Sequence, residues 1–556
     1  MERYKKTREA CLSYRKNTQE LRSSFLWYKI AAVPRLLIAA IILAFVILLP
    51  TEVSASGNGN GTRRPVGDMS FFGGISEGVR LPRTTESMLL EQGARRNRNQ
   101  NLSMRYSELI FLAGYPMRFD GTLNISSSGN VNPDQEVGTF TVNHTVTPSA
   151  ATRDDAIINR DITFQVNYRI VDHRIAGYQV IFTYDALRNS WSETITRGAQ
   201  VFTLDADVSH FVISIIEDRK PGVSYYRGDI SAHLVYVDQD GRVGTVDKQG
   251  SFHGYRSAWS AAETHRIDVI IASGFQMHYQ IRPSITMNKV LQFVRNEPAA
   301  ISFDGNFREV MQNNAGLRYD IFTAPVHLWN MPRSGTASIE TPNIFEQLPA
   351  HDLSFLRGNA AEDDIRRLFA TQILTGDPRF FQPSHAISRG QFVTMVTRAI
   401  RLPIEQPVAA ARGRVQPDTT VFHDVPRTRM EYPYIMAAYR AGLAVGRANS
   451  MFYFDYAIDR QEAFMIMIRA LGLSQMALNP TPATPFADDS LIAPWARREV
   501  TVAHAIGLAV PDQNGFFHPN RQLSMGEAAN IINELVEYMR VGLFSDYVYQ
   551  IVNIAR

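Results

Sequence analysis

The sequence has almost no cysteine, because Cys11 is the only one among 556 residues. It stands near the amino end, so the rest of the chain has neither a disulfide framework nor a thiolate metal site and must be stable through packing alone. A strong net charge is also missing, since 57 Lys and Arg residues nearly balance 54 Asp and Glu residues. This near-neutrality gives no general argument for nucleic-acid binding.

Common catalytic and cofactor motifs are missing as well. We find no Gly-x-Ser-x-Gly elbow, no P-loop and no dinucleotide fingerprint. His210, His253, His265 and His278 are scattered and form neither an H-x-x-x-H nor an H-E-x-x-H pattern, so no metal site is predicted. The leading interpretation is therefore a protein without cofactor, metal or enzymatic activity.

The amino end holds an apolar run at 36–49, which follows a basic segment and precedes the small-residue pattern Val53-Ser54-Ala55. These parts are typical of a secretory signal peptide over residues 1–55. A retained single-pass anchor stays open, although a spanning helix usually needs about 20 apolar residues. Both interpretations place the rest of the chain outside the cytoplasmic membrane, with membrane contact only through 36–49 if the signal is uncleaved.

Two regions of different texture follow. Residues 56–105 are rich in Gly, Asn, Arg and Ser and are predicted to form a flexible linker. Over 106–331, apolar and polar residues alternate, with many β-branched and aromatic side chains. This period of two indicates half-buried strands. Many short strands predict an all-β, sandwich-like region made of one or two β-sandwich or barrel domains, with one helical interruption near 287–295.

The β-rich region also holds the candidates for an enzyme or a binding face. Glycoside hydrolysis needs two carboxylates across a cleft, and Asp154-Asp155, Asp205 and Asp207 are acids in strand or loop settings. Solvated surface acids are the simpler interpretation. Tyr225-Tyr226 and Trp259 could serve a binding face, although packing between strands is the default for such aromatic residues.

After a second linker over 332–350, helical periodicity dominates. One pattern occurs three times, roughly every 70 residues: a Phe, a tight turn and the start of an amphipathic helix. The repeats are placed at 351–403, 418–474 and 484–540, and 541–556 forms a C-terminal tail. Two helices are predicted in each repeat, at 365–369 and 391–402, at 434–441 and 462–473, and at 495–506 and 527–540.

The second helix of each repeat begins with a capping pattern. A Ser or Asp at the N-cap is followed three residues later by Gln or Glu, so that the two side chains can satisfy each other's backbone N–H groups. We interpret this part of the pattern as structural. The pairs are Ser388 with Gln391, Asp459 with Glu462, and Ser524 with Glu527.

The residue after the cap is Arg389 in the first repeat, Arg460 in the second and Met525 in the third. A cation is mildly disfavoured at the first position of a helix by the helix dipole. A forked donor beside free backbone N–H groups makes an anion site. We therefore expect ligand binding at the two arginines, with a structural ion pair as the alternative.

These repeats resemble the S-layer homology (SLH) module, whose pattern runs F-x-D-V, W-A-x-x-A-I, G-I-x-x-G, F-x-P and T-R-A-E. Phe422-His423-Asp424-Val425 matches its opening element, and Trp495 matches its Trp, whereas the other repeats have Ala360 and Met430 there. The F-x-P element is matched to Phe381-Gln382-Pro383, Phe454-Asp455-Tyr456 and Phe517-His518-Pro519.

The resemblance implies three α-helical modules packed as a pseudo-trimer that binds a secondary cell-wall polysaccharide, in the family often through pyruvylated sugars. The Arg of T-R-A-E contacts the ligand in that family, which implies Arg389 and Arg460 as contacts. Trp495 would stack on a sugar, with a core Trp as the alternative. Met525 in place of Arg implies a weakened third groove.

Together these features predict an exported bacterial cell-surface protein in the cell wall, anchored by its C-terminal modules. Its β-rich region would face outward as a scaffold or binding region, and the protein could be an S-layer or envelope component with some self-assembly. The alternative is a carbohydrate-active enzyme tethered by the same modules, with catalytic carboxylates in the β-rich region.

Overall fold

The computed structural model divides the chain into two compact units, Met1–Ser56 and Gly57–Arg556. The predicted signal or anchor segment, most of the linker over 56–105 and much of the C-terminal tail lie outside the described residues. In the part of the chain that is described, no helix combines the length and the apolar composition that a membrane crossing needs. The described residues are 72–77, 100–129, 131, 135–149, 156–172, 177–295, 305–326, 332–404, 421–446, 450–478 and 480–546.

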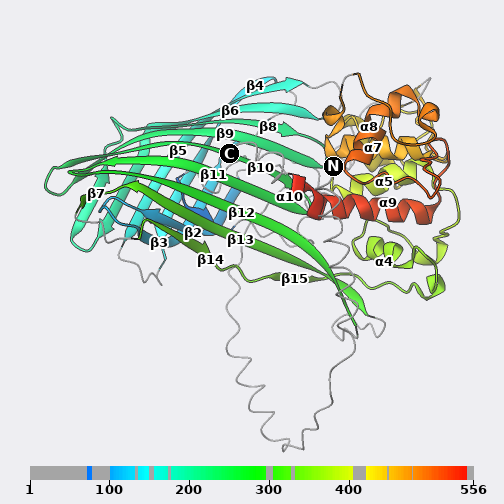
Figure 1. Cartoon of the computed structure of the whole chain (residues 1–556), viewed down its shortest axis with the longest axis horizontal. Helices are drawn as coiled ribbons and strands as arrows, with labels where there is room; N and C mark the ends of the chain where they lie inside the picture. Colours follow the sequence, from blue (N-terminus) through cyan, green and yellow to red (C-terminus); the bar gives the residue numbers. More distant parts are fainter. Residues whose placement is uncertain are drawn as a thin grey trace, which may run out of the picture. The chain divides into compact units, whose positions relative to one another are not determined.

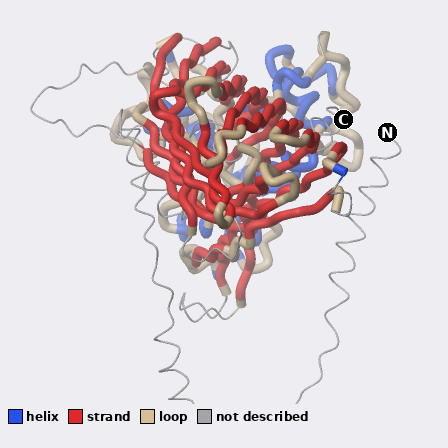
Figure 2. Tube along the Cα trace, turned by 90° about the vertical axis from the view of Figure 1, so that its left-hand side faces the viewer, coloured by secondary structure: helices blue, strands red, loops and turns tan. Residues whose placement is uncertain are grey.

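The middle of the chain forms one antiparallel sheet of long strands, which lie side by side in Figures 1 and 2. Its order is β1-β2-β3-β4-β5-β6-β7-β9-β10-β11-β12-β13-β14, with β8 paired to β6 and β9, and β15 paired to β13. The strands are β1 (Ile75–Ser76), β2 (Gln100–Ile110), β3 (Met117–Ser127), β4 (Val137–Pro148), β5 (Ile157–Asp172), β6 (Tyr178–Arg197), β7 (Gln200–Leu204), β8 (His210–Arg219), β9 (Val223–Asp238), β10 (Val243–Ser257), β11 (Ser260–Ala272), β12 (Gln276–Val294), β13 (Asn306–Thr323), β14 (Ser334–Ile339) and β15 (Ile344–Gln347).

The β-rich character is as predicted, but the sandwich-like arrangement of short strands is not what the structure has. Every second residue of β3 is buried, as the alternation predicts. Long strands twist, and here the last strands come beside the first. Arg105 Nη2 donates to Glu340 O (2.6 Å) and Arg118 Nη2 donates to Ser338 O (3.0 Å). The sheet thus curls around its own apolar core, so no second sheet is needed to cover its buried face.

The predicted helical interruption near 287–295 is wrong. Strand β12 runs through this segment, and its residues pair with β13 from Met287 opposite Asn313 to Val294 opposite Asn306. Pairing with a neighbouring strand overrides the helix-like spacing of a few apolar residues, because strand formation depends strongly on cross-strand neighbours.

The six predicted helices of the C-terminal region all overlap a helix in the structure. Their inward residues are fully buried, for example Ile365, Ile435 and Val500 at equivalent positions of the three repeats. The helices are α4 (Glu362–Ala370), α5 (Arg389–Ala399), α6 (Tyr432–Arg440), α7 (Arg460–Leu471), α8 (Pro494–Ala505), α9 (Met525–Glu537) and α10 (Leu543–Asp546), with the short turns η3 (Ser354–Leu356), η4 (Pro378–Phe380), η6 (Ser474–Met476), η7 (Asp489–Leu491) and the π-helical η8 (Tyr538–Gly542).

Three backbone hydrogen bonds join the three repeats in a closed ring. Ile387 N donates to Leu523 O (2.9 Å), Leu523 N donates to Ile458 O (3.1 Å), and Ile458 N donates to Ile387 O (3.2 Å). Each of these residues directly precedes the N-cap of α5, α7 or α9. The ring therefore gathers the amino ends of the three equivalent helices around an approximate threefold axis.

The carboxyl ends of the same three helices contact the sheet. Trp259 Nε1 donates to Ala399 O of α5 (2.7 Å), Gly222 N donates to Ala470 O of α7 (2.8 Å), and Ser260 Oγ donates to Met539 O just after α9. The last carbonyls of a helix have no partner within the helix, so residues in turns between strands satisfy these groups at α5 and α7, whereas α9 continues into η8 and α10 beyond Met539. Trp259 is fully buried in the core of the helical region and is a packing residue, as the simpler interpretation predicts.

Candidate functional site

The start of each second helix receives the F-x-P turn of the next repeat. Arg389 N donates to Tyr456 O (2.7 Å), Arg460 N donates to Arg521 O (2.9 Å), and Met525 N donates to His385 O (2.8 Å). Three junctions between repeats with equivalent backbone hydrogen bonds result. We name them the Arg389 groove, the Arg460 groove and the Met525 groove after the first residue of each helix.

The hydrogen-bond register corrects one sequence match. The Asp424 carboxylate accepts from Phe452 N (2.7 Å) and Tyr453 N, just as Asp488 accepts from Phe517 N (2.8 Å) and His518 N. The counterpart of Phe517-His518-Pro519 in the second repeat is therefore Phe452-Tyr453-Phe454, two residues before the predicted match. Both acids of the F-x-D-V element hold this turn by accepting its backbone N–H groups.

The predicted caps have the geometry of helix caps. Ser388 with Gln391 and Ser524 with Glu527 form reciprocal capping boxes. Asp459 accepts from Glu462 N (3.0 Å), but the Glu462 carboxylate turns instead to Arg389 Nε (2.7 Å). In the second repeat, the acid expected to complete a capping box thus serves the Arg389 groove.

Arg389 is buried, and its guanidinium is fully engaged by other groups of the protein. Its side chain is only 3% exposed, and all three guanidinium nitrogens are engaged: Nε with Glu462 Oε1, Nη1 with Phe452 O (2.5 Å) and Nη2 with Val445 O (2.8 Å). The guanidinium also lies 4.1 Å over the Phe452 ring. The geometry at Arg389 is that of the structural ion pair, the alternative that the sequence left open.

Arg460 occupies the same helical position with different surroundings. Its guanidinium makes no hydrogen bond or ion pair with any described residue, and its Nε is buried. It lies 5.0 Å from the ring of Phe464 and 5.2 Å from that of Phe517. Burial, together with the nearby Arg521 charge, lowers the pKa of Arg460. A buried cation without an acceptor is costly, and a bound anion would supply the missing partner.

The acid that could pair with Arg460 is engaged elsewhere. Glu527 is the counterpart of Glu462, but its carboxylate binds Arg521 Nη1 and the backbone N–H of Ser524 (3.0 Å). Burial raises the pKa of Glu527, but these partners outweigh burial and lower it overall. Arg521 stands where the Arg389 groove has Tyr456. The Arg460 groove therefore holds two guanidinium groups and one carboxylate.

The Met525 groove has neither of these charges at the equivalent positions. Met525 lies partly buried against the core of the helical region, and the N3 residue here is the neutral Gln391, whose side chain accepts from Ser388 N (3.0 Å). Without a cation or an acid at these positions, this groove has no counterpart of the charged groups of the Arg460 groove.

Trp495 lies near the Arg460 groove and is not a core residue. It is the second residue of α8 and is 49% exposed. The start of α8 is fixed to the residue after Arg460, because Gln461 Oε1 accepts from Ala493 N (2.9 Å). Its indole is therefore accessible to a ligand, whereas sugar stacking by this residue stays a prediction.

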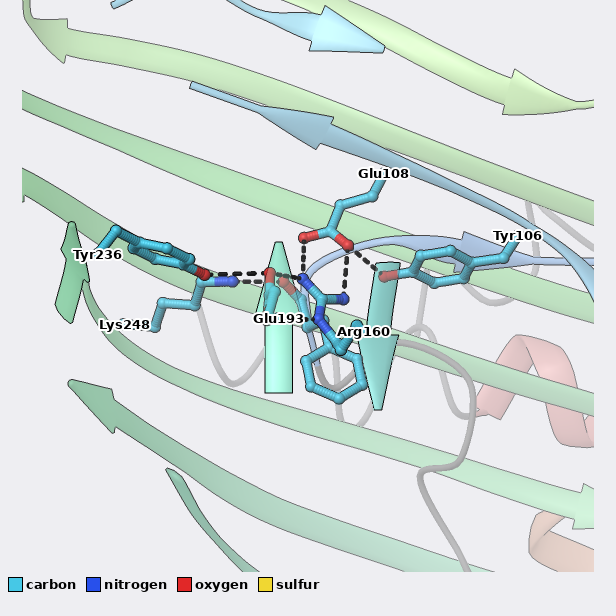
Figure 3. A network of polar contacts seen from close by, with 7 residues as sticks. Tyr106, Glu108, Arg160, Glu193, Tyr236 and Lys248 are labelled. Atoms are coloured by element: carbon cyan, nitrogen blue, oxygen red, sulfur yellow. Dashed lines mark hydrogen bonds and ion pairs between the residues drawn. The ribbon is translucent and has the colours of Figure 1, made fainter. Parts of the chain in front are cut away.

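Inside the sheet lies a charged network that sequence reasoning missed (Figure 3). Arg160 Nη2 donates to Glu193 (2.8 Å) and Arg160 Nη1 donates to Glu108 (2.9 Å). Tyr236 Oη donates to Glu193 (3.1 Å) and Lys248 Nζ donates to Phe72 O (2.8 Å). A signal was present, since Arg160 falls between Ile158 and Ile162 on the inward phase of β5.

This network is paired and buried, which is typical of a stabilising cluster. The side chains of Arg160 and Glu193 are both 2% exposed. Although burial alone raises the pKa of Glu108, the charges of Arg160 and Lys248 lower it overall, which favours the ionised carboxylate. Of the acids considered earlier, Asp205 accepts from Asp207 N (3.1 Å) in a turn, and 154–155 lie outside the described residues. Within the described ranges, no group of three His, Cys, Asp or Glu residues is arranged to hold a metal ion.

Comparison with known proteins identifies the second repeat. Residues 421–464, which include Arg460, match the model of the S-layer homology domain. The chain is 28% identical to an endoglucanase from Bacillus sp. (strain KSM-635) over 174 residues, 31% of this chain and 17% of the relative. It is 30% identical to an amylopullulanase from Thermoanaerobacterium thermosulfurigenes over 210 residues, 37% of this chain and 11% of the relative.

An S-layer protein from Bacillus thuringiensis subsp. finitimus is 26% identical over 171 residues, 31% of this chain and 19% of that protein. The chain thus spans less than a fifth of the length of these three relatives. The similarity covers about a third of the chain. It identifies an SLH domain within the C-terminal region, beside similarity to surface-layer proteins.

Proposed function

We propose that this chain is a non-enzymatic cell-surface protein, held to a cell-wall polysaccharide by three C-terminal SLH modules. The SLH match and the S-layer relatives support a cell-wall-associated protein outside the cell. The closed ring of backbone bonds through Ile387, Ile458 and Leu523 supports extending the module assignment to the first and third repeats. The β-rich region would be the outward-facing scaffold or binding region.

The unpaired Arg460 guanidinium is the observation that carries this proposal. It is largely buried between two aromatic rings, and the one nearby acid is held by Arg521. A carboxylate on the polymer, such as a pyruvyl group, would form charge-assisted hydrogen bonds with a forked donor in this setting. The Arg460 groove is therefore the proposed main contact, with Trp495 beside it, and the Arg389 groove is proposed to be mainly structural.

The experiment compares the full chain with Arg460→Gln in a pelleting assay with cell-wall sacculi. Losing a charge-assisted contact predicts roughly tenfold weaker binding. Chemical removal of the secondary polysaccharide from the sacculi should abolish binding of the unmodified protein. Arg188→Gln removes an exposed arginine of β6 and is the matched control. Unchanged binding of a folded Arg460→Gln variant would refute the assigned groove.

A tethered carbohydrate-active enzyme is the second proposal, and it is favoured by the endoglucanase and the amylopullulanase among the relatives. Its test is release of reducing ends from cell-wall and plant polysaccharides by the purified chain. Activity that is lost on substitution of acids in the sheet would support the enzyme and overturn the non-enzymatic proposal.

A further inference from the structure

A pocket of about 410 Å³ opens in the third repeat, between η7 and the loop over 512–521. We name it the third-repeat pocket. Two of its lining side chains are large, apolar and accessible, because Leu491 is 58% exposed and Phe516 is 38% exposed. The lining includes Leu491, Asp512, Phe516, His518, Asn520 and Arg521.

The aromatic wall of this pocket is held in place before any ligand arrives. The rings of Phe516 and His518 are stacked, with centroids 5.6 Å apart and planes at 21°. Asp512 fixes both residues, since it accepts from Phe516 N (2.9 Å) and binds His518 Nε2 (2.8 Å). The backbone N–H of Phe516 and the His518 side chain hold the pKa of Asp512 below its usual value.

The charged groups in this wall are paired within the protein, so the surface that the wall presents to a ligand is mainly apolar. The Asp512 carboxylate is already occupied by protein donors, and Arg521 is paired with Glu527. The surface left for a ligand is a pair of stacked rings beside Leu491, edged by the amide of Asn520. A neutral sugar fits this chemistry, since the apolar face of its ring can lie on an aromatic surface while its hydroxyls bond at the edge.

The third-repeat pocket shares a wall with the Arg460 groove. Arg521 lines the pocket, and its carbonyl accepts from Arg460 N (2.9 Å). Asn520 also lines the pocket, and its Oδ1 accepts from Gln461 Nε2 (2.8 Å). A polysaccharide with a charged unit at Arg460 would therefore bring its next sugar units towards this pocket.

The other repeats lack this aromatic pair. The position of Phe516 is taken by Phe380 in the first repeat and Met451 in the second, and that of His518 is taken by Gln382 and Tyr453. Phe380 is 81% exposed and has no ring two residues later to stack on. Only the third repeat thus places two rings at these positions.

We propose that the third-repeat pocket is a second carbohydrate subsite, which takes a neutral sugar ring of the same polysaccharide that the Arg460 groove binds through its charge. This inference rests on the proposed function for the class of ligand, whereas the residues that carry it are different. Charge would hold one unit of the polymer, and stacking on Phe516 would select the unit beside it.

The test measures the affinity of the full chain for purified secondary cell-wall polysaccharide by calorimetry. Phe516→Ser is expected to weaken binding about five- to tenfold, the equivalent of losing an aromatic contact. Phe380→Ser, at the equivalent position of the first repeat, should bind like the unmodified protein. Thermal unfolding of each variant shows that it is folded. The second variant, His518→Asn, should also weaken binding. Asn is chosen because it tolerates the left-handed backbone at this residue (φ 59°).

The dependence of binding on ionic strength distinguishes the contribution of the Arg460 groove from that of the third-repeat pocket. The effect of Arg460→Gln should shrink as ionic strength rises, because salt screens charge, whereas the effect of Phe516→Ser should stay constant. If Phe516→Ser and His518→Asn both bind like the unmodified protein while Arg460→Gln is weak, the pocket proposal is overturned and the anchor proposal stands. Loss with Phe516→Ser but not with Arg460→Gln would support the pocket and contradict the Arg460 groove.

Discussion

The Arg389 and Arg460 grooves have the same backbone hydrogen bonds, yet the two arginines differ in their partners. In the first groove, Glu462 and two backbone carbonyls bind all three nitrogens of the Arg389 guanidinium. In the second groove, the equivalent acid, Glu527, pairs with Arg521 instead. The deciding residue is Tyr456 in one groove and Arg521 in the other, in the turn supplied by the next repeat. Whether a motif arginine is paired with an acid thus depends on a residue outside its own motif.

The largest expected effect is on stability, from Arg389→Ala. This substitution removes the buried ion pair between Arg389 and Glu462, and breaking a buried pair in this way costs about 3–5 kcal/mol. Arg460→Ala should cost far less, since it removes a cation that has no acceptor. Urea unfolding of both variants measures the difference. Equal losses for the two would contradict the contrast between the grooves.

The next prediction converts one groove into the other. Arg521→Tyr should free Glu527 to pair with Arg460, as Glu462 pairs with Arg389. Polymer affinity should then fall about tenfold, because the Glu527 carboxylate would pair with Arg460 in place of the polymer's anion. Adding Glu527→Gln to this variant removes the internal acid, so part of the affinity should return. Affinity that stays low in the double variant would mean that Arg521 itself contributes most of the binding.

The smallest effect concerns acid stability of the Arg460 groove. The pKa of Glu527 is lowered overall in the folded protein. Its contribution to stability is therefore present above the unfolded value, about 4.3, and is lost as pH falls through the lower folded value. Glu527→Gln should flatten the fall of the urea midpoint between pH 6 and 3. Glu136→Gln, which changes an exposed acid directly before β4, serves as control, and an identical slope in all three proteins would contradict the prediction.

Local patterns predicted the helices well because their causes are local. Periodic apolar residues and the caps at Ser388, Asp459 and Ser524 lie within the helices that they specify. The match of the second F-x-P element failed because 452–456 holds four aromatic residues, so several alignments looked equivalent until the Asp424 hydrogen bonds fixed the register.

The single curled sheet and the different states of the two arginines depend on contacts between distant residues. Arg105 meets Glu340 across the curled sheet, and no short window contains both. Similarly, Arg389 pairs with Glu462 of the next repeat, 73 positions along the chain, whereas Glu527 near Arg460 is held by Arg521 of its own repeat. The strands of 106–331 could be predicted from alternation, but their arrangement could not, because the partner of each strand is chosen by the whole sheet.

The hydrogen bonds that join α5, α7 and the end of α9 to the β-rich region have a mechanical consequence. Helices α5 and α7 start at a groove and end on residues in turns between strands, Trp259 and Gly222. A pulling force between a wall polymer and the β-rich region would act along the axes of these helices, each about 16–20 Å long at 1.5 Å per residue. Because the proposed polymer contact is the Arg460 groove, this load would pass mainly along the backbone of α7, from Arg460 to the turn at Gly222.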